Sequence, residues 1–377
     1  MLQPRLEMAL GPHGGGATSN WEDDLAKRSL LDLDGMSTED LRSLVRQGER
    51  PTLKTLSRIS GLAVATVSRA LGDAPDIGQE TKEHVRTIAD AIGYVPNRAG
   101  VRLRTGRTNV ITLVVPAEGE VINNAAKLTN SIALELRGTQ FHLNVLPWFP
   151  DEDSLRPIKY IVENRSADAV VFNMTEPEDA RIDYLLKRNF PFATHGRSKW
   201  CDRHAYYDYD NSAFARIAVE RLAARGRRNV HAILPPSRQN YSQDMARGLE
   251  QAAARLDVRY RIAQNVDSDR SSDEIQHWIS HRLEQSPELD AIICSSSKVA
   301  IAAIVAIEQI GRRLGQDIDV YSKEVVPILK MFRHDIVVEF EDVANAGSFL
   351  AKAVMKQLLH PNEPLMQYLE VPEARIS

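Results

Sequence analysis

The sequence predicts a small all-α headpiece of the helix–turn–helix type, followed by an α/β core of two lobes. Between Thr52 and Ile92, apolar residues recur at helical spacing and glycines interrupt the pattern. After Thr108, short apolar runs alternate with longer helical stretches, which is typical of βαβ units and parallel sheets. Residues 109–377 are too many for one domain of ordinary size, ~100–200 residues, so we expect two lobes there.

The composition is that of a globular protein able to bury a core. The chain has 377 residues, of which 43% are hydrophobic and 26% charged. Its longest uninterrupted apolar run, Val299 to Ile307, is far shorter than the ~20 residues of a membrane-spanning helix. Cys201 and Cys294 are the only cysteines and form no metal-binding motif, so we expect no metal and no cofactor. Without an apolar leader at its start, the chain is expected to be cytoplasmic and not membrane-associated.

Charge is distributed unevenly along a chain whose formal net charge is −4. Residues 1–50 carry six basic and nine acidic residues, whereas residues 51–109 carry nine basic and five acidic residues, a local charge of +4. The net charge alone argues against a general nucleic-acid binder. A small basic block between acidic segments nevertheless often marks a nucleic-acid-binding module.

The N-terminal segment lacks a regular apolar pattern. Residues 1–50 are predicted to be a disordered extension, because glycines and prolines break the periodicity of its first part. Within this extension, Ser37 and Asp40 form a capping pattern that predicts a short helix over Thr38 to Val45. The expected division of the chain is an extension over 1–50, a headpiece over 51–96, a hinge over 97–108 and a core over 109–377.

Three short helices are predicted in the headpiece. Thr52 can cap the first helix and Gly61 ends it; the second runs from about Ala63 to Leu71 and the third from about Gln79 to Ile92. Their inward-facing residues are expected to form a small core of Leu56, Ile59, Leu62, Val67, Leu71, Val85, Ile88 and Ile92.

The first two of these helices meet the requirements of a helix–turn–helix. Gly61 gives a turn without a bulky side chain, and the second helix has one apolar face and one small, polar face for the major groove. Val64, Ala65 and Arg69 lie on the outer face, where Arg69 can donate two hydrogen bonds to guanine, worth ~1–3 kcal/mol of discrimination. Paired amphipathic helices with a glycine turn also occur in other folds, so the motif alone leaves that interpretation open.

A basic segment follows the headpiece. Arg98, Arg102, Arg104 and Arg107 lie within ten residues, and Leu103 lies among them. Such a linker suits a segment that orders on DNA, with the leucine inserted between base steps of the minor groove. A basic linker in solvent is an equally good interpretation of this composition.

Strand and helix candidates alternate through the core. The expected strands are Val110–Val115, His142–Leu146, Ala169–Asn173, Phe192–His195, Val230–Leu234, Tyr260–Gln264, Ala291–Cys294, Ile318–Tyr321 and Val337–Phe340. The expected helices are Ile122–Arg137, Ser154–Asn164, Asp179–Arg188, Ser212–Ala224, Asp244–Leu256, Ser272–Glu284, Lys298–Ile310 and Val343–Leu359.

Motifs in both parts of the chain resemble one family. The headpiece and linker contain TVSR and GYVPNR, followed by Leu103, in a continuous stretch from Thr52 to Val115. The core contains FPFATHGR, DYDNSAFARIAVERLAARGRRNV and DAIICSSSKVAIAAIVAI. From Thr52 to about Leu359, the chain resembles the LacI/GalR family of bacterial transcription regulators. The resemblance implies a periplasmic-binding-protein-like core of two Rossmann-like lobes with a ligand in the cleft.

The resemblance also implies a DNA interface. Val64, Ala65 and Arg69 fall where the family reads major-groove bases, and Leu103 falls where a hinge leucine enters the minor groove. The residues that fall where the family holds phosphates are Thr52, Thr66, Ser68, Thr81, Tyr94 and Asn97. Ala63 stands where the family has a hydroxyl that caps the recognition helix, which puts one phosphate contact in doubt. Gly100 replaces a hinge alanine and lowers the helix propensity of the hinge.

Ligands of open parallel sheets lie beyond the carboxyl ends of the strands. The effector site is therefore expected among Trp148, Thr175, Glu176, His195, Arg197, Asp210, Asn211, Ser297 and Glu324. Arg197 is the main candidate for a ligand contact. Asp210, Asn211 and Ser297 are also good helix caps, His195 can be a structural histidine, Trp148 can pack under a loop and Glu324 can be a solvated acid.

The chain departs from many relatives in this expected site. Relatives carry Asn-Asp at Ser296–Ser297, an arginine at Met245 and a Gly-aromatic-Asp run at residues 322–324. The effector therefore need not be the sugar of a well-known relative, and Arg197 and Lys323 would also suit a phosphosugar or a small carboxylate.

These features predict a sequence-specific transcription regulator, a repressor of carbohydrate or central carbon metabolism genes. Its expected partners are a palindromic double-stranded operator, a small-molecule effector and a second copy of the chain in a homodimer. A cytosolic solute-binding protein and an enzyme on the same α/β core remain as alternatives. No GxSxG, GxxxxGK[ST] or HExxH motif occurs in the sequence, so we expect no enzymatic activity and no catalytic residues.

Overall fold

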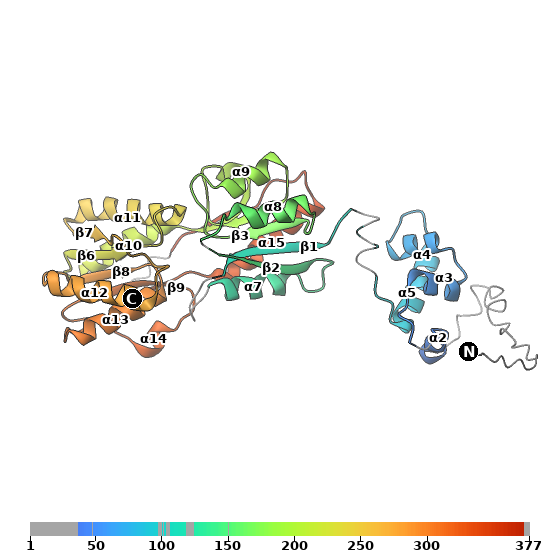
Figure 1. Ribbon diagram of the computed structural model, residues 1–377, viewed down its shortest axis with the longest axis horizontal. Helices are drawn as coiled ribbons and strands as arrows, with labels where there is room; N and C mark the ends of the chain where they lie inside the picture. The colour runs from blue at the N-terminus through green and yellow to red at the C-terminus, as the bar shows by residue number, and fades with distance from the viewer. Residues whose placement is uncertain are drawn as a thin grey trace, which may run out of the picture. The chain divides into compact units, whose positions relative to one another are not determined.

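The computed structural model describes residues 37–46, 48–96, 100, 102, 106–117, 124–149 and 151–372. The chain divides into two compact units, Met1–Gly106 and Arg107–Ser377 (Figure 1). The predictions for the first 35 residues, for Asn97 and for Leu103 lie outside the described residues. No helix among the described residues is long and apolar enough to cross a membrane.

The first unit is helical in its described part. Its helices are α2 (Thr38–Ser43), α3 (Leu53–Ser60), α4 (Val64–Leu71) and α5 (Gln79–Ile92). Thr52 caps α3 through a capping box with Thr55, and Gly61 ends the helix in the left-handed region at φ 69°, which a residue without Cβ adopts at little cost. Of the predicted core residues, Leu62 and Leu71 are partly buried and the others are buried.

Helix α2 belongs to this core. Ser37 and Asp40 form the capping box that the sequence predicted, and Leu41 is only 4% exposed among the core residues of the headpiece. Arg42 Nε donates to Ala91 O over 2.8 Å, and Arg58 Nη2 donates to Leu44 O over 3.0 Å. The expected extension over 1–50 therefore overlaps the headpiece at its C-terminal end.

The second unit contains two parallel sheets. The N-terminal lobe, or N-lobe, has the strand order β11-β5-β4-β3-β1-β2, and the C-terminal lobe, or C-lobe, has the order β10-β9-β8-β6-β7. The N-lobe strands are β1 (Val110–Pro116), β2 (His142–Trp148), β3 (Ala169–Phe172), β4 (Phe192–His195), β5 (Ala205–Tyr209) and β11 (Gln367–Glu370). The C-lobe strands are β6 (Asn229–Ile233), β7 (Arg259–Ile262), β8 (Ala291–Cys294), β9 (Asp319–Glu324) and β10 (Val337–Phe340).

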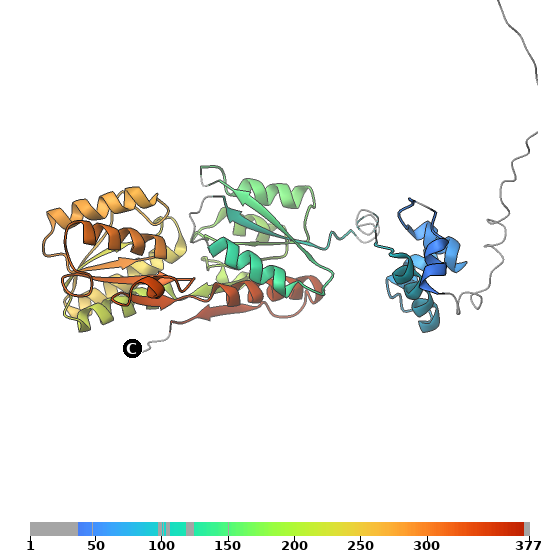
Figure 2. The same cartoon turned by 90° about the horizontal axis from the view of Figure 1, so that it is seen from below.

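Helices cover both faces of each sheet (Figure 1). The N-lobe helices are α7 (Asn124–Glu135), α8 (Leu155–Glu163), α9 (Ala180–Lys187), the 3₁₀ helix η2 (Cys201–Arg203) and α15 (Val343–Leu359). The C-lobe helices are α10 (Asn211–Ala224), α11 (Asn240–Leu256), α12 (Ser272–Gln285), α13 (Ser297–Gln309) and α14 (Leu329–Phe332). Figure 2 shows α7 and α15 side by side.

The alternation of side chains along each strand builds the two cores of each lobe. In β8, Ala291 and Ile293 pack against α10 and α11, whereas Ile292 and Cys294 pack against α12 and α13. Because both faces are buried, such strands are apolar throughout rather than alternating, which is why the sequence revealed them.

The chain passes between the lobes near Asp210 and near Asp342. Strands β5 and β11 were not predicted, and neither was the short helix α14. In β5, the sequence AYYDY holds a buried aspartate, and β11 is a short edge strand with the polar sequence QYLE. Neither segment has the apolar run that marked the other strands.

Candidate functional site

The outer face of α4 carries the predicted base-reading residues. Val64 is 41% exposed and Ala65 and Arg69 are exposed, whereas Val67 and Ala70 on the opposite face are fully buried. The sequence therefore assigned the two faces of this helix correctly. Ala63 precedes the helix and makes no side-chain cap, which leaves free N–H groups at its first turn.

The described residues that are expected at phosphates lie in the headpiece helices or directly beside them. Thr52 Oγ1 accepts a hydrogen bond from the Thr55 backbone N–H over 3.2 Å, so this hydroxyl also caps α3. Thr66 lies in α4 and Thr81 in the first turns of α5, both half-buried. Tyr94 follows Gly93, the left-handed end of α5. Ser68 is half-buried in α4.

In the second unit, the carboxyl ends of the strands of both lobes meet at one junction, the interlobe junction. The Asn240 backbone N–H at the start of α11 donates to the carbonyl of Thr175, beyond β3, over 2.8 Å. Arg238 and Glu176 form an ion pair of 3.5 Å between the same two loops. The predicted residues Thr175 and Glu176 thus lie where the lobes meet.

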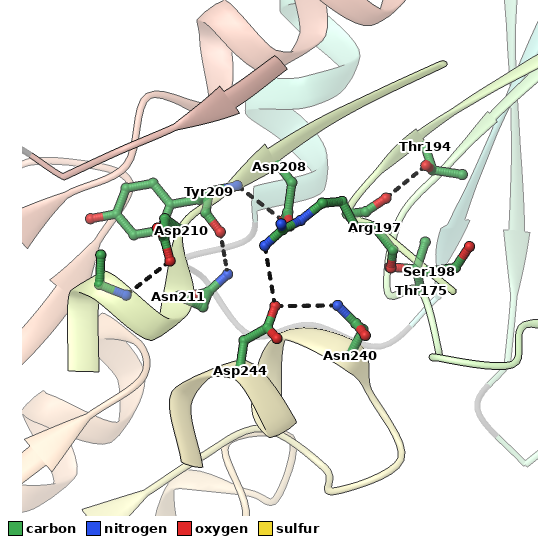
Figure 3. A network of polar contacts seen from close by, with 12 residues as sticks. Thr175, Thr194, Arg197, Ser198, Asp208, Tyr209, Asp210, Asn211, Asn240 and Asp244 are labelled. Carbon is green, nitrogen blue, oxygen red and sulfur yellow. Dashed lines mark hydrogen bonds and ion pairs between the residues drawn. The ribbon is translucent and has the colours of Figure 1, made fainter. Parts of the chain in front are cut away.

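Arg197 lies at the centre of a charged network in this junction (Figure 3). Its Nε donates to Asp208 Oδ2 over 2.6 Å, and its Nη2 lies 3.5 Å from Asp244 Oδ2 of α11. Asn240 Nδ2 donates to Asp244 over 3.3 Å, and Thr175 Oγ1 donates to the carbonyl of Arg197 over 2.9 Å. The guanidinium is therefore shared by two carboxylates, one from each lobe.

Burial governs the titration of Asp208 in this network. Its side chain is 4% exposed, and burial raises the pKa of Asp208 to about 6, against the lowering effect of the Arg197 guanidinium. On Arg197 itself, burial disfavours the charge, but the hydrogen bond to Asp208 outweighs that cost and raises the pKa. The pair stays ionised at neutral pH.

A second charged network contains His195. Lys323 Nζ lies 2.7 Å from Glu341 and donates to Asn211 Oδ1 over 3.0 Å. His195 Nε2 of the N-lobe lies 3.3 Å from the other oxygen of Glu341. Burial works against the charge on Glu341, but Lys323 and His195 lower the pKa of this carboxyl to about 2. The charge on Lys323 is therefore matched within the protein.

Buried polar atoms near the strand ends have no hydrogen-bond partner among the described residues. They are Trp148 Nε1, Asn173 Oδ1, Tyr209 Oη, both amide atoms of Gln239, Ser295 Oγ and Ser297 Oγ. Gln239 is 1% exposed at the start of α11, which follows β6, and Ser295 and Ser297 lie at the start of α13, which follows the neighbouring strand β8. Unpaired buried polar groups are costly, so such a set indicates a site that a ligand completes.

Three predicted effector residues make structural contacts. Glu324 is 3% exposed, and its carboxylate accepts a hydrogen bond from the Leu329 backbone N–H over 2.7 Å at the start of α14. Asp210 caps α10 through the Ala213 backbone N–H. Trp148 is 7% exposed and packs in the N-lobe core, so its ring face is not presented for stacking. These contacts match the structural alternatives for Trp148 and Asp210, and effector contacts by the three residues stay predictions.

Sequence reasoning missed several residues of the junction. Asp208, Asp244, Glu341 and Gln239 all lie there; Asp208 belongs to a strand that was not predicted, and Glu341 was passed over although it directly follows the predicted strand Val337–Phe340. The sequence feature that could have identified them is an acidic residue within or next to a buried segment, such as Asp208 in AYYDY. No group of three or more His, Cys, Asp or Glu in the described part of the chain is arranged to hold a metal ion.

Family models match both units of the chain. Residues 52–97 match the model described as bacterial regulatory proteins, lacI family, and residues 219–376 match the periplasmic binding protein-like domain. The HTH-type transcriptional regulator AglR of Rhizobium meliloti (strain 1021) is 28% identical over 317 residues, which covers 82% of this chain and 89% of that protein.

Solved structures share the fold. The lac repressor dimer bound to operator and the anti-inducer ONPF has a TM-score of 0.71 at 17% identity, covering 86% of this chain and 97% of that one. The complex of the transcriptional regulator CelR with cellobiose has a TM-score of 0.63 at 19% identity, covering 86% and 98%. The chain thus carries a headpiece that matches the lacI family of bacterial regulatory proteins, followed by a core that matches the periplasmic binding protein-like domain.

Proposed function

We propose that this chain is a repressor that binds a palindromic operator as a homodimer. A neutral sugar bound by the core raises or lowers its affinity for this operator. The observation that carries the proposal is the match of residues 52–97 to the lacI family, together with the exposed outer face of α4. A helix with small and polar residues on its exposed face, ending in Arg69, has the shape and donors needed to read base edges in the major groove.

The charges of the interlobe junction favour a neutral effector over a phosphosugar or a carboxylate. Arg197 is paired with Asp208 and Asp244, and Lys323 is paired with Glu341. An anionic ligand would have to displace a buried carboxylate from its cation, which leaves that carboxylate unpaired at high cost.

The unpartnered polar groups favour a ligand with several hydroxyls. Gln239 offers both a donor and an acceptor, and Ser295 and Ser297 offer hydroxyls that do either. A sugar hydroxyl can donate and accept at once, so it matches such groups better than an ion does. CelR, a fold relative, was solved with cellobiose.

The homodimer is supported by apolar side chains on one side of the C-lobe. Ile301 and Val305 of α13 are 40% and 36% exposed, and Met331 and Phe332 of α14 are 74% and 77% exposed. The two helices are joined by an ion pair between Glu308 and Arg333. Exposed apolar groups gathered in this way mark an interaction surface, and a two-fold pair of headpieces requires a second copy.

The test begins with DNA. Full-length protein should enrich a palindromic duplex from a random library, and a fragment starting at Arg107 should bind that duplex at least about 100-fold more weakly. Equal binding by the fragment would refute DNA recognition by the headpiece.

The effector is tested by thermal-shift screening of neutral sugars, sugar phosphates and small carboxylates. We expect a neutral sugar to stabilise the protein and to change its affinity for the selected duplex. Gln239→Leu should abolish that stabilisation, whereas Gln243→Leu, an exposed glutamine of the same helix, should retain it. Stabilisation by anionic ligands alone would contradict the neutral effector.

A further inference from the structure

The loop between α4 and α5 is fixed at both ends. Asp73 forms ion pairs of 3.0 Å with Lys82 and 3.1 Å with Arg86, which tie the start of the loop to α5. Near its end, Ile77 packs partly buried against the headpiece core, and its backbone N–H donates to Ala74 O over 3.2 Å. Three residues lie between these anchors, and the last of them is therefore held in a defined place.

That residue is Asp76, and its carboxylate forms an ion pair with the guanidinium of Arg69. Both side chains are 52% exposed, so the pair lies at the surface that carries the outer face of α4. A guanidinium has five N–H donors in a planar fork. A carboxylate on one part of that fork leaves the remaining donors available to a base.

We propose that Asp76 is a positioning residue for base recognition by Arg69. It holds the guanidinium in one orientation, which reduces the rotamer freedom that the arginine loses when it pairs with guanine. Its negative charge also competes with DNA phosphates for the guanidinium, which weakens binding to sequences that offer only phosphates. The inference rests on the proposed DNA-binding function and adds a determinant of its specificity.

Two other roles for Asp76 give different results. A surface ion pair often contributes little, in which case Asp76 changes only the overall charge of the loop. A carboxylate can also accept a hydrogen bond from a cytosine amino group, in which case Asp76 reads a base without Arg69. The test separates these roles because the chain supplies a matched control in Asp90, an exposed aspartate of α5 that lies outside this loop.

The experiment uses the full chain and the duplex that it selects from a random library. The measured quantity is the discrimination ratio, the affinity for this duplex divided by that for a duplex with one guanine replaced. This guanine is chosen as the position at which the Arg69→Ala variant shows the largest loss of discrimination. We expect Asp76→Asn to lower the ratio by about fivefold or more, corresponding to about 1 kcal/mol, and to strengthen binding to unrelated duplex DNA.

The controls define what would overturn the inference. Asp90→Asn removes the same charge and should leave the ratio within about twofold, Asp76→Glu should restore part of it, and circular dichroism should show every variant folded. In an Arg69→Ala background, Asp76→Asn should have no further effect on the ratio. An equal ratio for Asp76→Asn and Asp90→Asn, no guanine sensitive to Arg69→Ala, or a full effect of Asp76→Asn without Arg69 would each overturn it.

The failure of the inference can be told from the failure of the proposed function. If the wild-type chain enriches no duplex, DNA recognition itself fails. If it enriches one and only the Asp76 result is negative, the regulator stands and the positioning role is lost.

Discussion

At the scale of single residues, the interlobe junction combines neutralised charges with unpartnered neutral groups. The sequence analysis left open a phosphosugar or a small carboxylate beside a sugar, because Arg197 and Lys323 would also suit an anion. The structure shows that Asp208, Asp244 and Glu341 already hold these cations. The sequence could not reveal this, because the partners lie 11 to 47 positions away and meet only when the strand ends and the lobes come together.

Asp208 gives the first prediction. Its pKa in the folded state is raised by burial to about 6, above the ordinary value of ~3.9. The folded state therefore binds this proton more tightly than the unfolded state. The resulting stabilisation is complete below pH ~4 and is lost as the pH rises through about 6. Asp208→Asn should flatten this fall in the free energy of unfolding, measured by urea denaturation between pH 4 and 7.

A control for this prediction is Asp317→Asn. Asp317 is an exposed acid, and its hydrogen bond with Arg313 lowers its pKa to about 2, so its own stabilisation is lost only as the pH falls through that value. Its removal should leave the slope between pH 4 and 7 unchanged. The same slope for wild type and Asp208→Asn would contradict a raised pKa at Asp208.

At the scale of elements, the predictions succeeded where apolar periodicity is strong. The strands β1, β4, β8 and β10 and the helix α15 lie within about a residue of their expected bounds. Strand β5 was missed because it carries Asp208, which belongs to the charged network. A charged residue of the network thus interrupts the apolar pattern by which this strand could have been predicted.

Helices α10 and α11 supply the second prediction. A Cβ added at Gly248 of α11 would overlap the backbone carbonyl of Ser212 in α10. At a solvent-exposed helix position, Gly→Ala stabilises the folded state by about 1 kcal/mol. At Gly248 the two helices would have to separate, so we expect Gly248→Ala to destabilise the protein by about 1–3 kcal/mol. Urea denaturation measures this. A more stable variant would show that the two helices do not approach so closely.

At the scale of the whole molecule, the sequence predicted the two kinds of domain and their order. The expected division of the chain placed α2 in the extension over 1–50. In the structure, Leu41 of this helix packs into the headpiece core. The assignments to Asn97 and Leu103 stay predictions. The proposed dimer surface contains exposed apolar side chains such as Phe332, which no periodic pattern in the short helix α14 made visible.

The third prediction concerns that assembly. Phe332→Asp places a charge on the proposed dimer surface and should convert the protein to monomers at micromolar concentration in sedimentation experiments. Because one headpiece contacts only half of a palindrome, binding to the selected duplex should weaken at least about tenfold. Tyr160→Asp, at a 60% exposed aromatic of α8, should remain dimeric. A dimeric Phe332→Asp variant would place the interface elsewhere.

The way the chain passes between the lobes has a consequence for the order in which they are completed during synthesis. All five C-lobe strands lie between residues 229 and 340 in one continuous stretch. The N-lobe is assembled from two separated stretches, and it receives α15 and β11 only after that point. On the ribosome, the C-lobe can fold completely while the N-lobe still exposes the edge of β5 and the sheet face that α15 later covers. The N-lobe therefore begins to be synthesised first but completes its fold last.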